Sequence, residues 1–532
     1  MLFTSIEFIF FLCFTVILYF LAPLNRRWIV LLAASSIFYC LAGLKYIPYI
    51  MVTSLATYAT ACRIDGMFCE LDGRLEKEEL DREQKKCLKE QYKRKCKKTV
   101  ILSLLIALGI LCYSKFGSFV VERIQKLFDM LGMTPIESSK ISIIVPLGIS
   151  YYTFSAIGYM LDVYWRRYRA EKNFFKYLLY ILYFPHILQG PIARFDRLGH
   201  QLTKGHKFDY KRVCFGIQLM VWGCFKKLVM ADRLALFVNT VFADSDKQKG
   251  FVILIATFFW AMEFYADFSG CVDMARGMSQ IFGIQLDNNF RQPYFSKSVE
   301  EYWRRWHITL GTWFKDYLYR PVSVSAPVKK LSQRAKTKWG NQAGKRVIII
   351  ISLSIVWLAT GIWHGTGWNY VLWGMWNGCI IITSTLLENK YTVWKQKVHI
   401  NDQSCGWKIF QTLRTFLLVG IIPRILTRAG SVGEAITIYK NIFAEFNIWV
   451  FFDQSLYQYG LDRQDFWIAI LSILLLIAVD IWKEKGVQIR ETIASRNIVI
   501  RWIVYYLAIF SIIILGIYGS GYDASDFIYM KF

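Results

Sequence analysis

Two histidines, His307 and His364, are the residues of this sequence best suited to acid–base chemistry, and a tryptophan precedes each of them. His364 lies in "GIWHGTGWNYVLWG", between two strongly apolar stretches, and His307 lies in "EYWRRWHITLGTW". A neutral imidazole has a reference pKa of about 6.5 and accepts a proton near neutral pH. The pattern therefore indicates proton abstraction by a base that lies in apolar surroundings.

Motifs of competing chemistries are absent or incomplete. A nucleophile elbow, G-x-S-x-G, requires glycine where "ADFSG" has alanine. "GNQAGKR" misses the phosphate-binding P-loop by one residue and has arginine where serine or threonine should follow the lysine. The sequence contains no H-E-x-x-H, and its six histidines show no metal-ligand spacing. We therefore predict no metal site and no bound cofactor.

Acidic side chains in an apolar segment are a second group of candidates, because a buried titratable group is costly in a membrane. "MEFYADFSGCVDMARG" places Glu263 and Asp267 four residues apart on one face of a helix, with Asp273 and Arg276 following. An internal ion pair or a helix-end cap accounts for these residues, and a pocket wall is the alternative.

We expect Ser298–Val322 to form a helix that lies at an interface or dips into the protein. Aromatic residues share one of its faces and basic residues another, which is not typical of a span surrounded by lipid. The aromatic face comprises Trp303, Trp306, Leu310 and Trp313, and the other face comprises Arg304, His307, Gly311 and Lys315. A histidine bonded to neighbouring backbone is the alternative interpretation of His307.

His364 is expected near the turn of a helical hairpin. If Lys345 and Arg346 mark the cytoplasmic face, the following helix rises by roughly 22 Å before it reaches Gly361. The chain then returns through an apolar segment to Lys390. We expect His364 to face an internal cavity, with glycines that allow close approach. Packing between tryptophans is the alternative.

Run lengths define the class of protein. Of 532 residues, 55% are hydrophobic and 17% are aromatic, and a helix needs roughly 20 apolar residues to cross a hydrocarbon core. We predict an all-α integral membrane protein with about 10–13 transmembrane helices and additional re-entrant or interfacial helices. The apolar stretches lie near residues 5–22, 28–43, 46–62, 99–113, 141–161, 174–190, 213–230, 251–270, 347–363, 368–387, 408–428, 464–482 and 499–518.

The net charge of +25 suits a membrane protein, because cytoplasmic loops collect lysine and arginine. Nucleic acid is the less suitable explanation, and we predict no nucleic-acid partner. Two basic segments, 63–98 and 321–346, are expected to be cytoplasmic loops, which places the N-terminus outside. We predict one polytopic domain over 1–532, with its catalytic core at 260–375.

The chain resembles the membrane-bound O-acyltransferase family, and most closely its bacterial alginate O-acetyltransferase-type branch. The resemblance rests on a series of motifs that occur in the same order along the sequence. "YFPHILQGPIARF" is similar to the family's Pro…Gly-Pro-Ile-x-Arg segment, and "DFSGCVDMARG" to its Asp-Phe-Ser-Gly…Asp-Met stretch. "NFRQPYFSKSVEEYWRRWHITLGTWFKDYLYRPV" and "GIWHGTGWNYVLWG" resemble its two histidine regions, and "FIYMKF" its usual ending.

The resemblance implies that His364 is the catalytic histidine and His307 the second active-site position, within a central tunnel. It also implies acyl transfer, most simply of an acetyl group, from a cytoplasmic thioester to a hydroxyl of an extracytoplasmic polysaccharide. His307, with Arg304 or Arg305, would orient the donor or stabilise the developing oxyanion. Our substrate-binding candidates are Asp267, Trp303, Arg304, Arg305, Trp306, Lys315, Asp316, Trp363 and Trp368.

The expected partners follow from the same resemblance. They are acetyl-CoA or an acyl carrier protein on the cytoplasmic side, a lipase-like acyltransferase and the polysaccharide outside, and the lipid bilayer. The basic residues of 329–346 would bind the anionic donor, and ordinary positive-inside charge is the alternative. We expect a multi-pass protein of a bacterial plasma membrane.

Three other functions are compatible with the sequence. D-alanyl transfer to teichoic acid is the enzymatic alternative. A transporter or channel, with His364 in a proton relay, would usually show internal pseudo-symmetry, and none is visible in the sequence. A purely structural scaffold for an extracellular enzyme is the third alternative, and it assigns no function to the two histidines.

Overall fold

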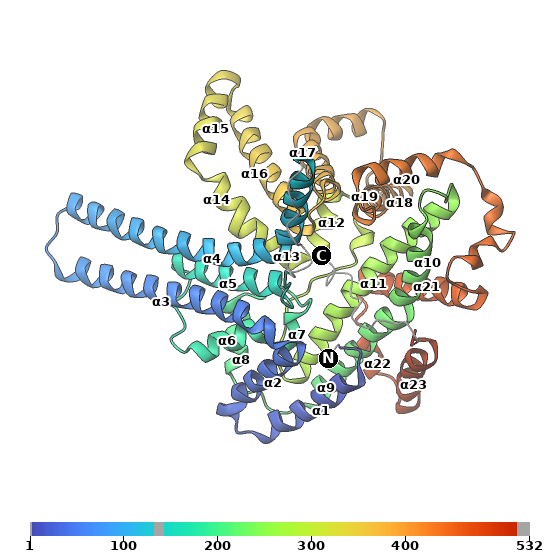
Figure 1. Ribbon diagram of the computed structural model, residues 1–532, viewed down its shortest axis with the longest axis horizontal. Coiled ribbons are helices and arrows are strands. Elements are labelled where there is room, and N and C mark those ends of the chain that lie inside the picture. Colours follow the sequence, from blue (N-terminus) through green and yellow to red (C-terminus); the bar gives the residue numbers. More distant parts are fainter. Residues whose placement is uncertain (1–2, 132–142, 519–532) are drawn as a thin grey trace. The chain divides into compact units, whose positions relative to one another are not determined.

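Helices joined by turns and irregular segments make up the parts of the protein that the computed structural model describes, namely residues 3–131 and 143–518 (Figure 1). Within these ranges β-type pairing is limited to an isolated antiparallel bridge between Phe290 and Trp306. The predicted all-α integral membrane class is confirmed. The terminal "FIYMKF" motif, at 527–532, lies outside the described residues.

Within the described residues, eight helices are long and apolar enough to cross a membrane, or up to nine if a pair bent by 106° forms one span. The sequence predicted 10–13 spans, and in the described residues several of the apolar stretches behind that number form helices that are short or broken. The stretch at 174–190 divides into α6 (Phe174–Leu182) and α7 (Phe184–Ile187), with a non-helical residue, Tyr183 (φ −45°, ψ 108°), between them. Pro185 lies in the first turn of α7, where proline is tolerated. In the interior of one continuous helix it would lack a hydrogen-bonding N–H and would clash with the preceding turn. The eight helices are Arg82–Met130, Tyr210–Ala243, Phe251–Ile281, Asn341–His364, Trp368–Lys397, Cys405–Arg428, Arg463–Glu484 and Ile498–Leu515.

The chain forms two compact units, which we describe separately. The first comprises residues 1–217 and 275–287, and the second comprises 218–274 and 288–532. Helices α9 (Tyr210–Cys224) and α11 (Phe251–Ile281) contribute residues to both. The other helices of the first unit are α1 (Ile6–Leu21), η1 (Leu24–Arg26), α2 (Arg27–Ala42), η2 (Leu44–Tyr46), α3 (Ile47–Lys77), α4 (Arg82–Met130), α5 (Ile149–Tyr164), α6, α7 and α8 (Phe195–Thr203).

Helices α3 and α4 form a long antiparallel hairpin (Figure 1). The segment 63–98 was predicted as a loop, but the structure shows that it is helical on both sides of a short turn. Asp81 starts α4 with a capping box, in which its side chain accepts from the Gln84 N–H and the Gln84 side chain accepts from the Asp81 N–H. Leu71 of α3 packs in one apolar cluster with Leu88 of α4.

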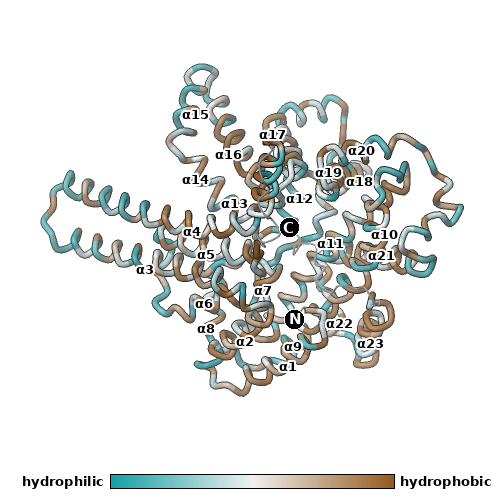
Figure 2. The backbone as a smooth tube through the Cα atoms, in the orientation of Figure 1, coloured by the Kyte–Doolittle hydropathy of each residue, from teal (hydrophilic) through white to brown (hydrophobic). Residues whose placement is uncertain are grey.

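Length explains why the outer part of this hairpin is polar. The 49 residues of α4 extend over roughly 70 Å, whereas the hydrocarbon core of a bilayer is about 30 Å thick. The apolar part of α4 can therefore span the bilayer while its N-terminal turns lie in water. Figure 2 shows this division, with hydrophilic residues at the outer ends of α3 and α4.

The second unit contains the remaining helices. They are η4 (Phe225–Ala231), α10 (Asp232–Ala243), η5 (Pro293–Phe295), α12 (Val299–Arg305), α13 (Ile308–Phe314), η6 (Lys315–Tyr319), α14 (Arg320–Ser323), α15 (Ala326–Trp339), α16 (Asn341–His364), α17 (Trp368–Lys397), α18 (Cys405–Phe416), η7 (Leu417–Ile421), α19 (Ile422–Arg428), α20 (Val432–Ala444), η8 (Ile448–Phe451), η9 (Ser455–Gln458), α21 (Arg463–Glu484), α22 (Ile489–Ala494) and α23 (Ile498–Leu515).

The second basic segment, 321–346, was also predicted as a loop and is largely helical. It contains α15 and the first turn of α16, which pack against each other. Gly340 joins them with a φ of 86°, in the left-handed region that suits glycine. Ser332 donates a hydrogen bond to the Gly344 carbonyl oxygen at 2.9 Å, which ties the two helices together.

Buried ion pairs join the helices of the second unit. Lys227, in the π-helical segment η4, donates to Asp267 of α11 at 2.7 Å and lies 2.8 Å from Asp232 of α10. Its neighbour Lys226 binds Asp273 of α11 at 2.8 Å. A charge inside a membrane protein is tolerated when it is paired in this way. The ion-pair interpretation of Asp267 and Asp273 therefore agrees with the structure.

The substitution Lys227→Met is expected to destabilise the protein strongly, because it leaves two carboxylates buried without their cation. Breaking a buried pair costs about 3–5 kcal/mol, whereas an exposed pair contributes about 0–1 kcal/mol. Lys126→Ala, which breaks an exposed pair with Glu122, is the matched control. Thermal unfolding of the purified protein in detergent measures both. Equal unfolding temperatures of the two variants would contradict this assignment.

Candidate active site

His307 lies at a break between two short helices. α12 ends at Arg305, Trp306 is extended, and α13 begins at Ile308. His307 itself has φ 46° and ψ 51°, the left-handed conformation that a non-glycine residue adopts at a cost of about 1–3 kcal/mol. The prediction of one continuous helix over Ser298–Val322 is therefore wrong.

Asn289 explains the break, because it binds the backbone that directly follows His307. The Ile308 N–H donates to the Asn289 carbonyl oxygen at 3.1 Å, and the Thr309 N–H donates to Asn289 Oδ1 at 3.0 Å. The Thr309 hydroxyl also donates to Oδ1, at 2.9 Å, and His307 Nδ1 lies 3.3 Å from it. These contacts, with the bridge between Phe290 and Trp306, hold the segment in a turn and not in a helix.

His364 is the last residue of α16, directly before the turn to α17. The two helices pack as the predicted hairpin, with Gly365–Gly367 between them. Close approach requires glycine here: a Cβ on Gly374 would lie 2.5 Å from the Trp357 carbonyl oxygen. Gly361, beside His364, was expected to allow close approach, and a Cβ there would lie 2.7 Å from the Tyr370 carbonyl oxygen. The imidazole of His364 is buried, with a relative exposure of 7%.

Trp363 lies between the two histidines. Its indole ring centroid is 6.2 Å from that of His307 and 4.7 Å from that of His364. Trp373 of α17 covers His364 from another direction, at 4.7 Å, and Phe268 of α11 covers His307 at 4.8 Å. The structure therefore brings the two predicted catalytic histidines into one aromatic cluster, although 57 positions separate them in sequence.

Two further tryptophans of the predicted site extend this cluster. Trp303 packs edge-on against Trp373 at 5.7 Å and donates its indole N–H to Asn377. Trp306 is buried and stacks between Phe264 and Tyr302. The sequence placed Trp303 and Trp306 on one helical face, whereas the break at His307 sends them to different neighbours.

Five of the predicted substrate-binding residues lie at the margin of the cluster or outside it. The Arg304 side chain is 68% exposed and lies 3.6 Å from Glu300. Arg305 binds Glu301 and Glu484 at 2.6 and 2.8 Å. Trp368 is 75% exposed, and Lys315 is also exposed. Buried Asp316 lies 3.2 Å from Arg320.

Sequence reasoning missed several buried polar residues of this region. Lys227, which binds Asp267, could have been recognised from the sequence, because the lysine pair to which it belongs interrupts the apolar stretch at 213–230. Arg424 of α19 is buried with its guanidinium 4.0 Å from the centroid of the Phe264 ring. Asn289 gave no signal, since an asparagine in "DNNF" is typical of any turn.

Burial determines the protonation of His307, whose relative exposure is 2%. Desolvation disfavours the charged imidazolium and lowers the pKa of His307 to about 3. His307 is therefore neutral at physiological pH, so one of its ring nitrogens carries a proton and the other a lone pair.

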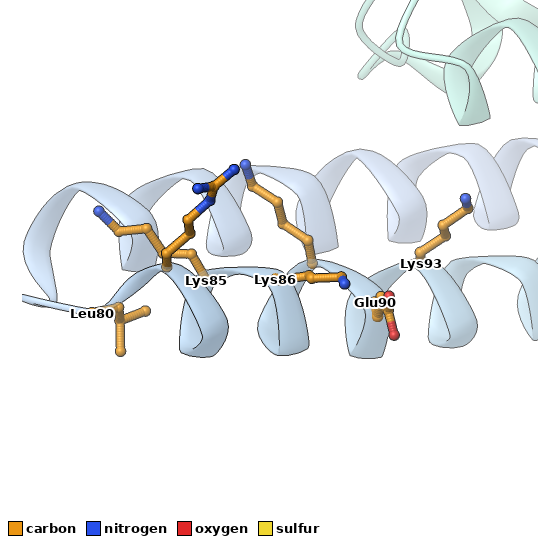
Figure 3. Close-up of a pocket in the computed structure, with 7 residues that line it drawn as sticks. Leu80, Lys85, Lys86, Glu90 and Lys93 are labelled. Atoms are coloured by element: carbon orange, nitrogen blue, oxygen red, sulfur yellow. The ribbon is translucent and has the colours of Figure 1, made fainter.

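Two exposed basic surfaces lie on the helical hairpins. The first follows α4, where Figure 3 shows Lys85, Lys86 and Lys93 beside Leu80 and Glu90 along a surface depression. The second follows α15 and the start of α16, with seven exposed basic residues and no acidic residue over 329–346. In residues 3–131 and 143–518, no group of three or more His, Cys, Asp or Glu side chains is arranged to hold a metal ion.

The family comparison identifies the region that surrounds His307. A model of the membrane-bound O-acyltransferase family, MBOAT, matches residues 169–336. This range includes His307 and most of α15, and it ends before His364.

Known proteins similar to this chain extend the match beyond that range. A probable alginate O-acetylase AlgI of Pseudomonas syringae pv. tomato is 32% identical over 346 residues, 65% of this chain and 60% of the relative. A probable alginate O-acetylase AlgI of Azotobacter vinelandii is 30% identical over 380 residues, 71% of this chain and 67% of the relative. A peptidoglycan O-acetyltransferase of Helicobacter pylori is 27% identical over 443 residues, 78% of this chain and 73% of the relative. The chain thus spans about three fifths to three quarters of the length of these relatives.

The low pKa of His307 predicts a pH dependence of stability. The unfolded chain binds a proton at about pH 6.5 and the folded chain at about pH 3, so acidification in this window favours unfolding. Between pH 7 and pH 5 this contribution is about 2 kcal/mol. His307→Asn, which tolerates the left-handed backbone, should reduce the loss of unfolding temperature over that range.

The matched control is His399→Asn, at an exposed histidine that also has a positive φ, of 55°. This variant should lose stability on acidification as the unmodified protein does. The same acid-induced loss in His307→Asn and in the unmodified protein would contradict the assignment.

Proposed function

The chain belongs to the membrane-bound O-acyltransferase family, and from this premise we propose that it transfers an acyl group from a thioester donor to a hydroxyl group. The observation that carries the proposal is the burial of His307 and His364 in one aromatic cluster around Trp363. Two histidines of low exposure in such a cluster suit proton transfer in a site from which water is excluded.

In the proposed reaction His364 is the general base. Its imidazole takes the hydroxyl proton while the hydroxyl oxygen forms a bond to the thioester carbon. The tetrahedral intermediate then loses its carbon–sulfur bond, and the imidazolium returns the proton to the departing thiolate. The products are an ester and a free thiol, and no other reactant is needed. General-base catalysis of this kind contributes about 10²–10⁴-fold to the rate.

The acyl group that we propose is acetyl, and the acceptor is an extracytoplasmic polysaccharide. The names of the similar proteins support this choice, since they describe O-acetylation of alginate or peptidoglycan. Transfer across the bilayer requires a passage to the histidines from both sides, and we propose the tunnel that the family resemblance implies. A separate extracytoplasmic acyltransferase would complete transfer to the polymer. D-alanyl transfer to teichoic acid is the alternative.

We place the donor side at the basic surface of α15. The five exposed cations of α15 and the two at the start of α16 suit the phosphates of coenzyme A or an acidic acyl carrier protein. The polypeptide leads from this surface through α16 directly to His364. Positive-inside charge supports a cytoplasmic position for α15 and for the outer part of α4, in a plasma membrane, with the N-terminus outside.

His364→Ala is expected to lose at least about 10-fold, and up to 10⁴-fold, of acyl transfer because the base is removed. Base-labile acetate and D-alanine released from washed envelopes of cells that carry each variant measure transfer and distinguish the two acyl groups. His399→Ala is the control for expression and membrane insertion. More than a tenth of the normal ester content in His364→Ala would refute the base assignment. Solute flux that survives His364→Ala, without thioester consumption by the unmodified protein, would favour a transporter.

Neutralising Lys329, Lys330 and Arg334 to glutamine should weaken donor binding by roughly 10-fold at low salt, because each exposed ionic contact contributes about 0.2–1 kcal/mol. Binding of coenzyme A and of an acidic acyl carrier protein to the protein in nanodiscs, measured at two salt concentrations, tests this. The matched control neutralises Lys85, Lys86 and Lys89 on α4. Equal weakening by both sets would assign the effect to net charge alone.

A further inference from the structure

Asn289 has an unusual environment for an asparagine next to a candidate catalytic histidine. Its relative exposure is 1%, and one atom of its side chain, Oδ1, lies within hydrogen-bond distance of three polar groups. Two of them belong to Thr309, through its N–H at 3.0 Å and its hydroxyl at 2.9 Å. The third group is His307 Nδ1, at 3.3 Å.

The Thr309 backbone identifies the chemical type of that atom. A backbone N–H can only donate, so the amide atom that faces it must be the oxygen and not the NH₂ group. The side-chain orientation of Asn289 is thereby determined. An amide oxygen carries no hydrogen, so His307 Nδ1 makes a hydrogen bond to it only when Nδ1 itself carries the proton.

We propose that Asn289 is a positioning residue that holds His307 as the Nδ1–H tautomer, so that Nε2 presents its lone pair and accepts a hydrogen bond from the substrate. In this state His307 cannot donate through Nε2 to the oxygen of the thioester. The inference rests on the proposed function and deepens it, because it assigns an accepting role to the second histidine. The substrate group that His307 recognises is then a hydrogen-bond donor, a hydroxyl or an amide N–H.

Two further observations support this assignment. Desolvation lowers the pKa of His307, which removes the doubly protonated imidazolium that could donate from both nitrogens. Asn289 also fixes the backbone next to His307, since the Ile308 N–H donates to the Asn289 carbonyl oxygen at 3.1 Å. Side chain and backbone of Asn289 therefore set both the tautomer of His307 and its left-handed conformation.

The direct test is ¹⁵N nuclear magnetic resonance of the full chain, labelled with [¹⁵N]histidine and reconstituted in nanodiscs. His307→Gln identifies the His307 signals among the six histidines by their loss. We expect a protonated Nδ1 and an unprotonated Nε2 at pH 7. An unprotonated Nδ1 with a protonated Nε2, or a fully protonated ring, would overturn the inference.

Substitutions at Asn289 separate positioning from general structural support. Asn289→Asp keeps the accepting oxygen and should retain the Nδ1–H tautomer, whereas Asn289→Leu should lose it. Asn377→Leu is the matched control, because Asn377 is equally buried in the cluster and binds Trp303. It should leave the tautomer of His307 unchanged. Retention of the Nδ1–H tautomer in Asn289→Leu would refute the role of Asn289, and so would an equal loss of that tautomer in both leucine variants.

Acyl transfer provides the second readout. Loss of one hydrogen bond of this kind corresponds to about a 10-fold decrease in kcat for Asn289→Leu, with recovery in Asn289→Asp. The tautomer signal does not depend on turnover, so the two proposals fail in different ways. A Nδ1–H tautomer in a protein that transfers no acyl group would refute the proposed function alone. Active protein with the Nε2–H tautomer would refute the role of Asn289 alone.

Discussion

The hydrogen bonds that converge on the side-chain oxygen of Asn289 determine the local structure around His307. Buried polar groups of a membrane protein must find partners inside the protein, because hydrocarbon offers none. The side-chain amide of Asn289 is one such partner, for His307 and Thr309. The carboxylates of Asp232 and Asp267 are the partners of the Lys227 ammonium group. The first contact breaks a helix, and the second joins three helical segments. Asn289 finds its partners 18–20 positions away in sequence, and Lys227 pairs with Asp267, 40 positions away, as well as with nearby Asp232. Contacts of this kind give apolar helices specific neighbours.

Aromatic side chains complete the surroundings of the two histidines. Trp363 and Trp373 lie against His364, and Phe268 lies against His307, so both imidazoles have ring contacts in place of water. Such a cluster fixes ring orientation and excludes water, which would hydrolyse an activated acyl group. It also gives the tryptophan before each histidine a physical role. Trp363 contacts both imidazoles, whereas Trp306 packs into the aromatic stack beside Arg424.

The basic residues lie on the same helices as the apolar membrane segments, and not on separate loops. The apolar part of α4 and its basic N-terminal part belong to one continuous helix, as do those of α16 (Figure 2). A helix of this kind extends the chain into water without an irregular segment, because its backbone groups remain paired on both sides of the interface. The two basic segments that we predicted as loops are helical for this reason. Lysine, arginine, glutamate and glutamine are good helix formers, so their high content did not argue against helix.

The sequence by itself determined the all-α membrane class and the hairpin that carries His364, and it singled out the two histidines as candidates. Run length, glycine spacing and an imidazole in apolar surroundings are local properties, and they can be interpreted without knowing any distant contact. Tertiary structure decided what depends on contacts between remote residues. The break at His307 requires Asn289, the state of Asp267 requires Lys227, and the exposure of Trp368 and Arg304 depends on which faces their helices bury. A helical periodicity assigns side chains to faces only while the helix continues, and here a single asparagine 18 positions away ends it.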